Sequence, residues 1–261
     1  MHLPSLPWIA LLSAASMATA RPPAAASSST AAAKPPAFFL AGDSTTAVDG
    51  GWGNGFLAPL ISPAWGVNVG KSGATTVSFV AGGYWENVTT HLKENAEEFE
   101  CYVTISFGHN DQKEASGITL EQYQANLVRF ANEVKSLGGT PLLTTSLTRR
   151  AFPSNSPHNA TDSLHDQRLA TIAAAASTNS TVVDLNAASL AYVNAIGKDA
   201  AWAYNYAGTG SAADTTHLNP WGEVVFGRMV ADLVVRARPE MEGWVRKNET
   251  LSEAIWSGVP A

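Results

Sequence analysis

The chain of 261 residues has a single cysteine, Cys101, so no disulfide bond can form within it. Cys101 opens an apolar stretch, where we expect it to be buried as a small hydrophobic side chain. Basic residues are also scarce, because 16 Lys and Arg stand against 22 Asp and Glu, a net charge of −6. A protein that binds nucleic acid needs a basic face, so this balance argues against such a partner. No stretch after the amino-terminal segment is long and apolar enough to anchor the chain in a membrane.

The amino-terminal segment is typical of a secretory signal. Its apolar run from Trp8 to Ala15 is too short to span a bilayer, and Ala18-Thr19-Ala20 follows as a cleavage site. We therefore predict a signal peptide over 1–20, a disordered spacer rich in Ala, Pro and Ser over 21–36, and one domain over 37–261. The protein is expected to be secreted and extracellular. Four sequons suit this location and predict surface glycosylation at Asn87, Asn159, Asn179 and Asn248.

Short apolar stretches alternate with helical patterns through the domain. The clearest helix begins with Asn219 as its N-cap and Pro220 in its first position. The alternation predicts an α/β fold, a parallel sheet with helices on both sides, and ligands of such sheets bind at the carboxyl ends of the strands. The predicted strands, whose continuous apolar character suits burial on both faces, are 37–41, 66–69, 101–107, 141–147 and 181–185.

Four short segments at such strand ends or before a helix carry the residues of a serine hydrolase. A serine hydroxyl is a poor nucleophile until a base takes its proton. Ser44 has a candidate base in His217, which we place in a loop ahead of the Asn219 helix, and Asp214 can orient that imidazole. An ordinary turn serine and a solvated Asp–His pair are the alternatives. The segments are Gly42-Asp43-Ser44-Thr45, Asn68-Val69-Gly70, Gly108-His109-Asn110-Asp111 and Asp214-Thr215-Thr216-His217.

Attack on an acyl carbon also needs donors for the oxyanion that forms. The backbone N–H groups of Ser44 and Gly70 and the side-chain amide of Asn110 can supply three. Glycine suits the second position because a bare Cα allows close backbone approach. Asn110 has an alternative interpretation as a turn residue that bonds its own backbone. Together, the four segments predict ester hydrolysis through a Ser-His-Asp triad and an acyl-enzyme.

The residues next to these candidates are interpreted as structural. His109 and Asp111 point away from Asn110 if the chain alternates, so we expect both to support its loop, and Asp43 to stabilise the turn of Ser44. A metal site built from these three residues is conceivable, but they fall on two loops without ligand-like spacing. We predict no metal and no cofactor.

The four segments resemble those of the SGNH (GDSL-like) hydrolase superfamily, and within it the rhamnogalacturonan acetylesterases. Thr45 replaces the Leu of the GDSL name, as is usual in that group, and Val69-Gly70-Lys71-Ser72 is similar to its A-G-R-S segment. The segments 107–111 and 214–217 match its F-G-H-N-D and D-x-T-H blocks. The similarity extends from about Phe38 to Val235. It departs at Gly82-Gly83-Tyr84-Trp85, which lacks an Arg before the aromatic residue, and in the cysteines of some members.

The resemblance implies a three-layer α/β/α sandwich with a five-stranded parallel sheet in flavodoxin-like order. It also implies that Ser44 is the nucleophile, that Gly70 and Asn110 are oxyanion donors, and that Asp214 and His217 complete the triad. The implied activity is that of a carbohydrate esterase that removes acetyl groups from a pectin-type polysaccharide, most simply rhamnogalacturonan, and we expect a monomer. The alternatives are a general GDSL-type esterase or lipase with other substrates, such as acetylxylan, and an inactive carbohydrate-binding domain.

Several residues are candidates for substrate contact. Lys71, Arg149 and Arg150 can meet uronate carboxylates, and a solvated basic turn is their alternative. Trp52, together with Trp202, Tyr204 and Tyr206, can stack on sugar rings, although core packing explains aromatic residues equally well.

Overall fold

The computed structural model of the protein describes residues 1, 34–206 and 214–261. Apart from Met1, the predicted signal peptide lies outside the described residues, as does all but the end of the predicted spacer. Lys34–Ala261 forms one compact unit. Its elements are β1 (Pro36–Gly42), α1 (Gly53–Leu57), β2 (Trp65–Asn68), α2 (Thr76–Ala81), α3 (Tyr84–Asn95), β3 (Glu100–Ser106), the 3₁₀ turn η1 (Glu114–Ser116), α4 (Leu120–Ser136), β4 (Thr140–Thr144), α5 (His165–Ser177), β5 (Thr181–Val183), α6 (Leu185–Trp202), β6 (Asn205–Tyr206), β7 (Asp214–Leu218), α7 (Pro220–Ala237), η2 (Pro239–Trp244) and α8 (Glu249–Ser257).

Five strands form one parallel sheet in the order β2-β1-β3-β4-β5. This order confirms the flavodoxin-like sheet that the resemblance implied. The central pair has Pro36 of β1 opposite Glu100 of β3 and Gly42 opposite Ser106, so both strands end at the same level. The turns that follow β1 and β3, which carry Ser44 and Asn110, are therefore neighbours.

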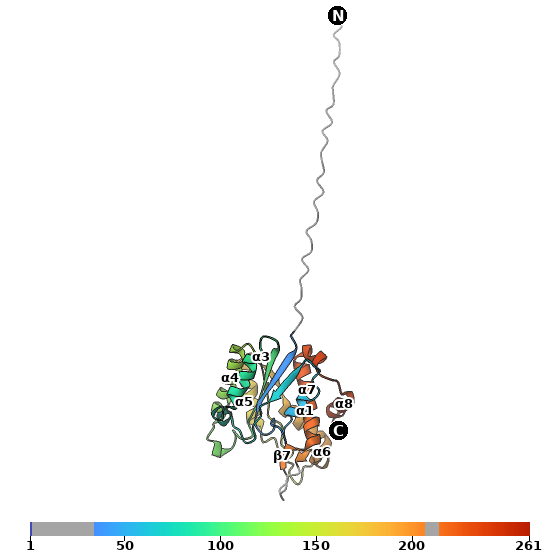
Figure 1. Cartoon of the computed structure of the whole chain (residues 1–261). Helices are drawn as coiled ribbons and strands as arrows, with labels where there is room; N and C mark the ends of the chain where they lie inside the picture. Colours follow the sequence, from blue (N-terminus) through green and yellow to red (C-terminus); the bar gives the residue numbers. More distant parts are fainter. Residues whose placement is uncertain (2–33, 207–213) are drawn as a thin grey trace. The chain divides into compact units, whose positions relative to one another are not determined.

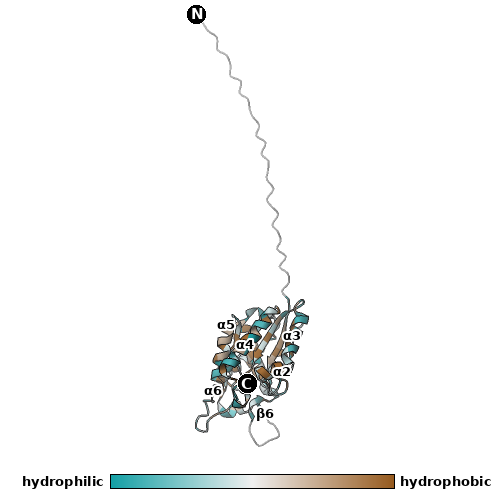
Figure 2. Cartoon of the chain, turned by 90° about the vertical axis from the view of Figure 1, so that its left-hand side faces the viewer, coloured by the Kyte–Doolittle hydropathy of each residue, from teal (hydrophilic) through white to brown (hydrophobic). Residues whose placement is uncertain are grey.

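Helices cover both faces of the sheet, as predicted. In Figure 1, α3, α4 and α5 lie on one side of the strands and α1, α7 and α8 on the other. The residues of β1 alternate between the two cores, with Phe38 and Leu40 in one cluster and Phe39 and Ala41 in the other. In Figure 2, which looks onto the side where α3, α4 and α5 lie, these helices carry both hydrophilic and hydrophobic residues. Burial on both faces explains why the strands read as continuous apolar runs.

Two predicted strands are shorter in the structure than in the sequence analysis. β4 ends at Thr144 rather than at position 147, because Thr145 turns its hydroxyl to Asp184 and to the N–H of Asn186. β5 ends at Val183 rather than at position 185, because Asp184 accepts the N–H of Ala187 and caps α6. Apolar character alone continues through both points and does not mark the end of either strand.

Helix α7 ties the last part of the chain to the site. It begins as predicted, with Asn219 accepting the N–H of Gly222 at 2.8 Å and Pro220 in the first turn. Its backbone packs directly on α1, since a Cβ added to Gly227 would lie 2.2 Å from the carbonyl carbon of Gly55. One turn after its start, Glu223 accepts the N–H of Gly50 at 2.6 Å. The helix thus anchors the loop that follows the predicted nucleophile.

Three smaller predictions concern the surface and the core. Cys101 is buried and free, as expected. None of the helices within 34–206 and 214–261 is long and apolar enough to cross a membrane. The sequon asparagines Asn87, Asn159, Asn179 and Asn248 are all exposed, which confirms their predicted place on the surface.

Candidate active site

Ser44, His217 and Asp214 form a continuous hydrogen-bonded chain. The Nε2 atom of His217 lies 2.7 Å from the Oγ atom of Ser44, and its Nδ1 atom lies 2.6 Å from Oδ2 of Asp214. The serine is 8% exposed, whereas about a third of each of the other two side chains is open to solvent. The structure thus brings together the three residues predicted to form a catalytic triad. The distances allow a proton to pass from the hydroxyl to the imidazole.

The predicted nucleophile, Ser44, lies in a turn that its neighbour Asp43 fixes. The backbone carbonyl of Asp43 accepts the N–H groups of Thr46 and Ala47, at 3.1 and 3.0 Å. The Oδ1 atom of the same residue accepts the N–H and the hydroxyl of Thr45, at 2.9 and 2.8 Å. Asp43 therefore has the turn-stabilising role predicted for it. The turn can close this tightly because Gly42 precedes it, and a Cβ there would lie 2.2 Å from Oγ1 of Thr46.

The predicted base His217 and its predicted carboxylate Asp214 belong to a short strand, and not to the loop that the sequence suggested. They lie in β7, which pairs antiparallel with β6. The first four of the five residues of β7 are polar, so no apolar pattern marked it as a strand. Burial raises the pKa of Asp214, but the N–H groups of His217 and Thr216 and the His217 ring outweigh this effect and lower the pKa below its usual value. Asp214 is thereby kept ionised beside the imidazole.

The three predicted oxyanion donors differ in how free they are. Among the described residues, the N–H of Ser44 has no acceptor. The N–H of Gly70 instead donates to Oδ1 of Asn68 at 3.0 Å, so this donor is engaged, contrary to expectation. The Nδ2 group of Asn110 donates one bond, to the carbonyl of Ala74 at 3.0 Å, and has a second N–H for an oxyanion. Ser44 and Asn110 are the donors that the geometry favours.

The other two polar residues of the Asn110 turn act as supports, as predicted. Asp111 accepts the N–H and the hydroxyl of Thr76, at 2.8 and 2.6 Å, and burial raises its pKa despite these bonds. The Nδ1 atom of the buried His109 lies 3.6 Å from Oδ2 of Asp43, a separation too long for a hydrogen bond. The His109–Asp43 contact links the turn of Asn110 to that of Ser44. Burial raises the pKa of Asp43, but the interactions with His109 and Thr45 outweigh burial, so the pKa lies below its usual value.

Two predicted substrate residues are instead structural. Trp52 is fully buried in the core, so it cannot stack on a sugar. Arg150 is 2% exposed, and its guanidinium donates to Oδ1 of Asn205 at 2.5 Å and to the carbonyl of His217 at 2.7 Å. Burial lowers the pKa of Arg150 to about 9. In the sequence, Arg150 stands at the start of a loop, where an arginine is usually exposed. The fold shows instead that Arg150 is buried and hydrogen-bonded to β7.

The remaining candidates stay at or near the surface. Lys71 is exposed, and its backbone N–H donates to the carbonyl of Gly42 at 2.9 Å, next to the nucleophile turn. Arg149 is partly buried and donates to the hydroxyl of Thr216, between the two triad residues of β7. Burial lowers the pKa of Arg149, while Asp43 and Asp214 partly offset this effect. Of the other aromatic candidates, Trp202 and Tyr206 are exposed and Tyr204 is buried.

Three residues that hold the site were given no role from the sequence. Asn68 occupies the N–H of Gly70, Glu223 holds Gly50, and the ammonium of Lys113 donates to Oδ1 of Asn110 at 2.7 Å. The first and third stand two and three residues from a predicted donor, so short-range turn geometry could have suggested them. The Glu223 contact spans 173 residues and has no local signal.

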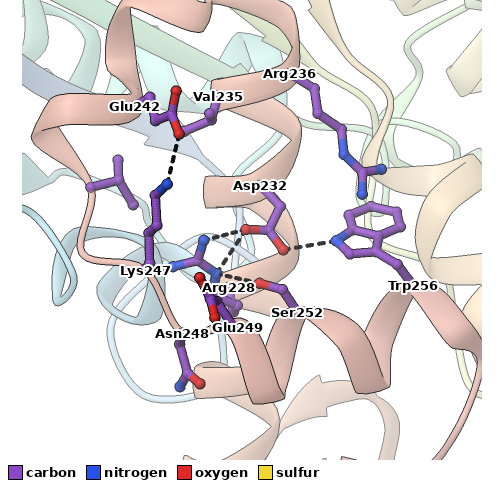
Figure 3. A pocket seen from close by; sticks show the side chains of 11 residues that line it. Arg228, Asp232, Val235, Arg236, Glu242, Lys247, Asn248, Glu249, Ser252 and Trp256 are labelled. Atoms are coloured by element: carbon purple, nitrogen blue, oxygen red, sulfur yellow. Dashed lines mark hydrogen bonds and ion pairs between the residues drawn. The ribbon is translucent and has the colours of Figure 1, made fainter.

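Two hollows in the surface lie away from these residues. One, of about 320 Å³, lies between α7 and α8, and its charged side chains bind one another (Figure 3): Arg228 donates to Asp232, which accepts the indole N–H of Trp256 at 2.7 Å. The adjoining one, of about 570 Å³, is lined by α1 and the same helices. Within the described part of the chain, no group of three or more His, Cys, Asp or Glu side chains is arranged to hold a metal ion.

Comparison with known proteins relates the chain to a large family. The GDSL-like Lipase/Acylhydrolase family matches residues 40–224. Rhamnogalacturonan acetylesterase RhgT of Bacillus subtilis is 34% identical over 122 residues, which are 44% of this chain and 50% of that protein. This chain thus matches only half the length of that relative.

Two solved structures share the fold. Protein YxiM of Bacillus subtilis has a TM-score of 0.65 at 20% identity, covering 81% of this chain and 59% of that one. A variant of Axe2, an acetyl-xylooligosaccharide esterase of Geobacillus stearothermophilus, has a TM-score of 0.57 at 21% identity, covering 83% and 99%. At this identity, the likeness extends to the fold alone.

Proposed function

Because the chain belongs to the GDSL-like lipase/acylhydrolase family, we propose that it is a serine carboxylic ester hydrolase that removes acetyl groups from a pectin-type polysaccharide. One observation carries the reaction type. Ser44, His217 and Asp214 stand in hydrogen-bonded sequence at 2.7 and 2.6 Å, at the carboxyl edge of the sheet. An inactive carbohydrate-binding domain would have no need for this arrangement. We therefore set that alternative aside.

The residues divide the reaction into two acyl transfers. Nε2 of His217 takes the hydroxyl proton of Ser44 as its Oγ atom bonds to the acetyl carbon, and the carbonyl electron pair moves onto oxygen. The N–H of Ser44 and an N–H of Asn110 stabilise that oxyanion. His217 then gives the proton to the sugar oxygen as the ester bond breaks, which leaves acetyl-Ser44 and a free sugar hydroxyl. A water molecule then attacks the acetyl carbon of acetyl-Ser44 in the same way, giving its proton to His217. Acetate leaves as His217 returns the proton to the Oγ atom of Ser44.

The substrate assignment rests on similarity and on charge. RhgT is named a rhamnogalacturonan acetylesterase, and Axe2 is named an acetyl-xylooligosaccharide esterase. The first is the closer in identity, at 34% against 21%. Lys71 lies beside the turn of Ser44, and Arg149 lies beside β7. Such cations suit the negatively charged uronates of a pectin-type polymer. Rhamnogalacturonan is therefore our first substrate, and acetylated xylan is the second.

Release of acetate tests the proposal. Purified wild type and Ser44→Ala are incubated with acetylated rhamnogalacturonan, acetylated xylan and p-nitrophenyl acetate. We expect wild type alone to release acetate from the pectic polymer, with a loss of about 10⁴-fold or more in the variant. Serine-dependent cleavage of xylan or of the small ester only would preserve the mechanism and reject the pectic substrate. Equal activity of the two proteins would reject the mechanism.

The predicted location is part of the same proposal. We infer that the protein is secreted after removal of residues 1–20 and carries glycans at some of its four sequons, all of which are exposed. Expression of the full chain in a eukaryotic secretory host tests this inference. The expected results are a mature amino terminus at Arg21 in the medium and a loss of mass on treatment with an N-glycosidase. Retention of the full chain inside the cells would contradict it.

A further inference from the structure

We propose that Lys113 is a positioning residue of the oxyanion site. Its ammonium holds the side-chain amide of Asn110 in the one orientation that presents an N–H to the acyl oxygen. The inference rests on the proposed function, because it assigns the amide to an oxyanion. It adds a residue that lies outside the four segments from which the site was predicted.

The contacts of the amide select its orientation from both ends. Nζ of Lys113 lies 2.7 Å from Oδ1 of Asn110, and Nδ2 of Asn110 lies 3.0 Å from the carbonyl of Ala74. An ammonium can only donate and a carbonyl can only accept, so each partner excludes the flipped amide. In the flipped orientation, the amide oxygen would face the oxyanion and repel it. Two independent partners therefore favour the same productive state.

The local backbone brings the lysine to this position. Gln112 donates its N–H to the carbonyl of Gly108 at 3.1 Å, and Lys113 donates its own to the carbonyl of Asn110 at 3.2 Å. This turn returns the chain on itself, so the side chain three residues after Asn110 lies over its amide. Asp111, within the turn, is anchored to α2 through Thr76. The turn is thus fixed at its base while Lys113 closes it from the solvent side.

The turn also lies next to the nucleophile. The N–H of Asp43, immediately before Ser44, donates to the carbonyl of Ser106 at the end of β3, at 3.2 Å. Asn110 is 7% exposed, so its amide works in a largely dry environment, where a fixed dipole is more effective than in water. Lys113 itself is exposed. Solvent therefore screens its charge, and we assign its main effect to orientation rather than to attraction of the oxyanion.

A different role for an exposed lysine at this place is direct binding of a substrate carboxylate. The two roles separate on a small neutral ester, which carries no carboxylate. A positioning role changes kcat for p-nitrophenyl acetate and leaves KM unchanged, since the oxyanion forms only after binding. A binding role leaves that reaction unchanged and raises KM for the acidic polymer.

The test compares Lys113→Met, Lys113→Arg, Asn110→Ala and the double variant Lys113→Met/Asn110→Ala on p-nitrophenyl acetate. We expect Lys113→Met to lower kcat about tenfold, with KM unchanged. This is less than the loss on the order of 100- to 1,000-fold for a missing donor, because Ala74 still favours the correct amide orientation. Lys113→Arg should retain most of the activity, since it restores a donor. The double variant should be no slower than Asn110→Ala.

Lys93→Met is the matched control, because Lys93 is also exposed and lies at the end of α3. It should match wild type in kcat, and both lysine variants should keep the wild-type melting temperature. Unchanged kcat in Lys113→Met, or additive losses in the double variant, would overturn the inference. Failure of the proposed function is distinguishable, because it would appear as full activity in Ser44→Ala.

Discussion

The guanidinium of Arg150 donates to the backbone carbonyl of His217 at 2.7 Å. The backbone N–H of Arg150 also donates to the carbonyl of Thr215, at 2.9 Å. The loop after β4 thus makes two hydrogen bonds to β7, at and near the predicted base His217. An arginine expected at the substrate is instead part of the support for the imidazole.

Replacement of Arg150 should therefore affect both stability and rate. Arg150→Met removes the donor to the buried Oδ1 atom of Asn205, at a cost of about 1 to 3 kcal/mol, and the donor to the partly buried carbonyl of His217, which costs less because solvent can reach it. We expect urea unfolding to show a loss within that range or above it, and kcat to fall. Arg129→Met, on the exposed face of α4, is the control and should be near wild type. Wild-type stability in Arg150→Met would show that these bonds contribute nothing.

Asp214→Asn should separate the charge of the carboxylate from its shape. The amide oxygen can still accept the N–H groups of Thr216 and His217, but the negative charge that stabilises the imidazolium is lost. We expect kcat on p-nitrophenyl acetate to fall by about 10⁴-fold with a near-native melting temperature. Asp199→Asn, at an exposed position in α6, serves as the control. A loss of tenfold or less would mean that Asp214 is not the orienting carboxylate.

The contact between α1 and α7 tolerates no side chain at Gly227. A Cβ there would lie 2.2 Å from the carbonyl carbon of Gly55, so the helices must separate to admit it. Gly227→Ala is expected to lower the free energy of unfolding by about 1 to 3 kcal/mol, measured in urea. Gly243→Ala is the matched control, because a Cβ at that position meets nothing within 4 Å. Equal stability of the two variants would contradict this packing.

The pair Asp184–Arg168 should contribute stability that depends on pH. Burial raises the pKa of Asp184, but hydrogen bonds from Arg168, Thr145 and the Ala187 N–H outweigh burial. The pKa of Asp184 therefore lies below its usual value. A lowered pKa stabilises the fold above the unfolded pKa of about 3.9, and the contribution disappears as pH falls through the folded pKa.

Asp184→Asn tests this dependence, because asparagine remains a good N-cap for α6. We expect the variant to be about 1.5 kcal/mol less stable than wild type at pH 7, the value of a charged hydrogen bond. The difference should shrink as the pH is lowered below about 4, in urea unfolding at several pH values. A difference that stays constant with pH would exclude the charge as its source.

Much of the fold and the core of the site follow from local patterns. Continuous apolar runs identified all five strands, and the rule for parallel sheets placed Ser44 and Asn110 at one edge. The hydrogen bond from the N–H of Gly70 to Asn68 was not predictable in the same way. Asn68 lies only two residues earlier, but whether its side chain turns to that N–H depends on the end of β2. Burial of Trp52 and Arg150 depends on partners far along the chain, which residue type alone does not reveal.

The bond between Ser44 and His217 joins residues 173 positions apart. Closing so long a loop costs conformational entropy that must be lost before the contact can compensate for it, so we expect this bond to form late in folding. The predicted nucleophile lies in the turn just after the first strand of the chain, β1, and the predicted base lies in β7, which leads into α7 and follows all five strands of the parallel sheet in the chain. Recovery of esterase activity after dilution from denaturant therefore follows completion of the tertiary structure rather than formation of helices, and can serve as a clock for the last step of assembly.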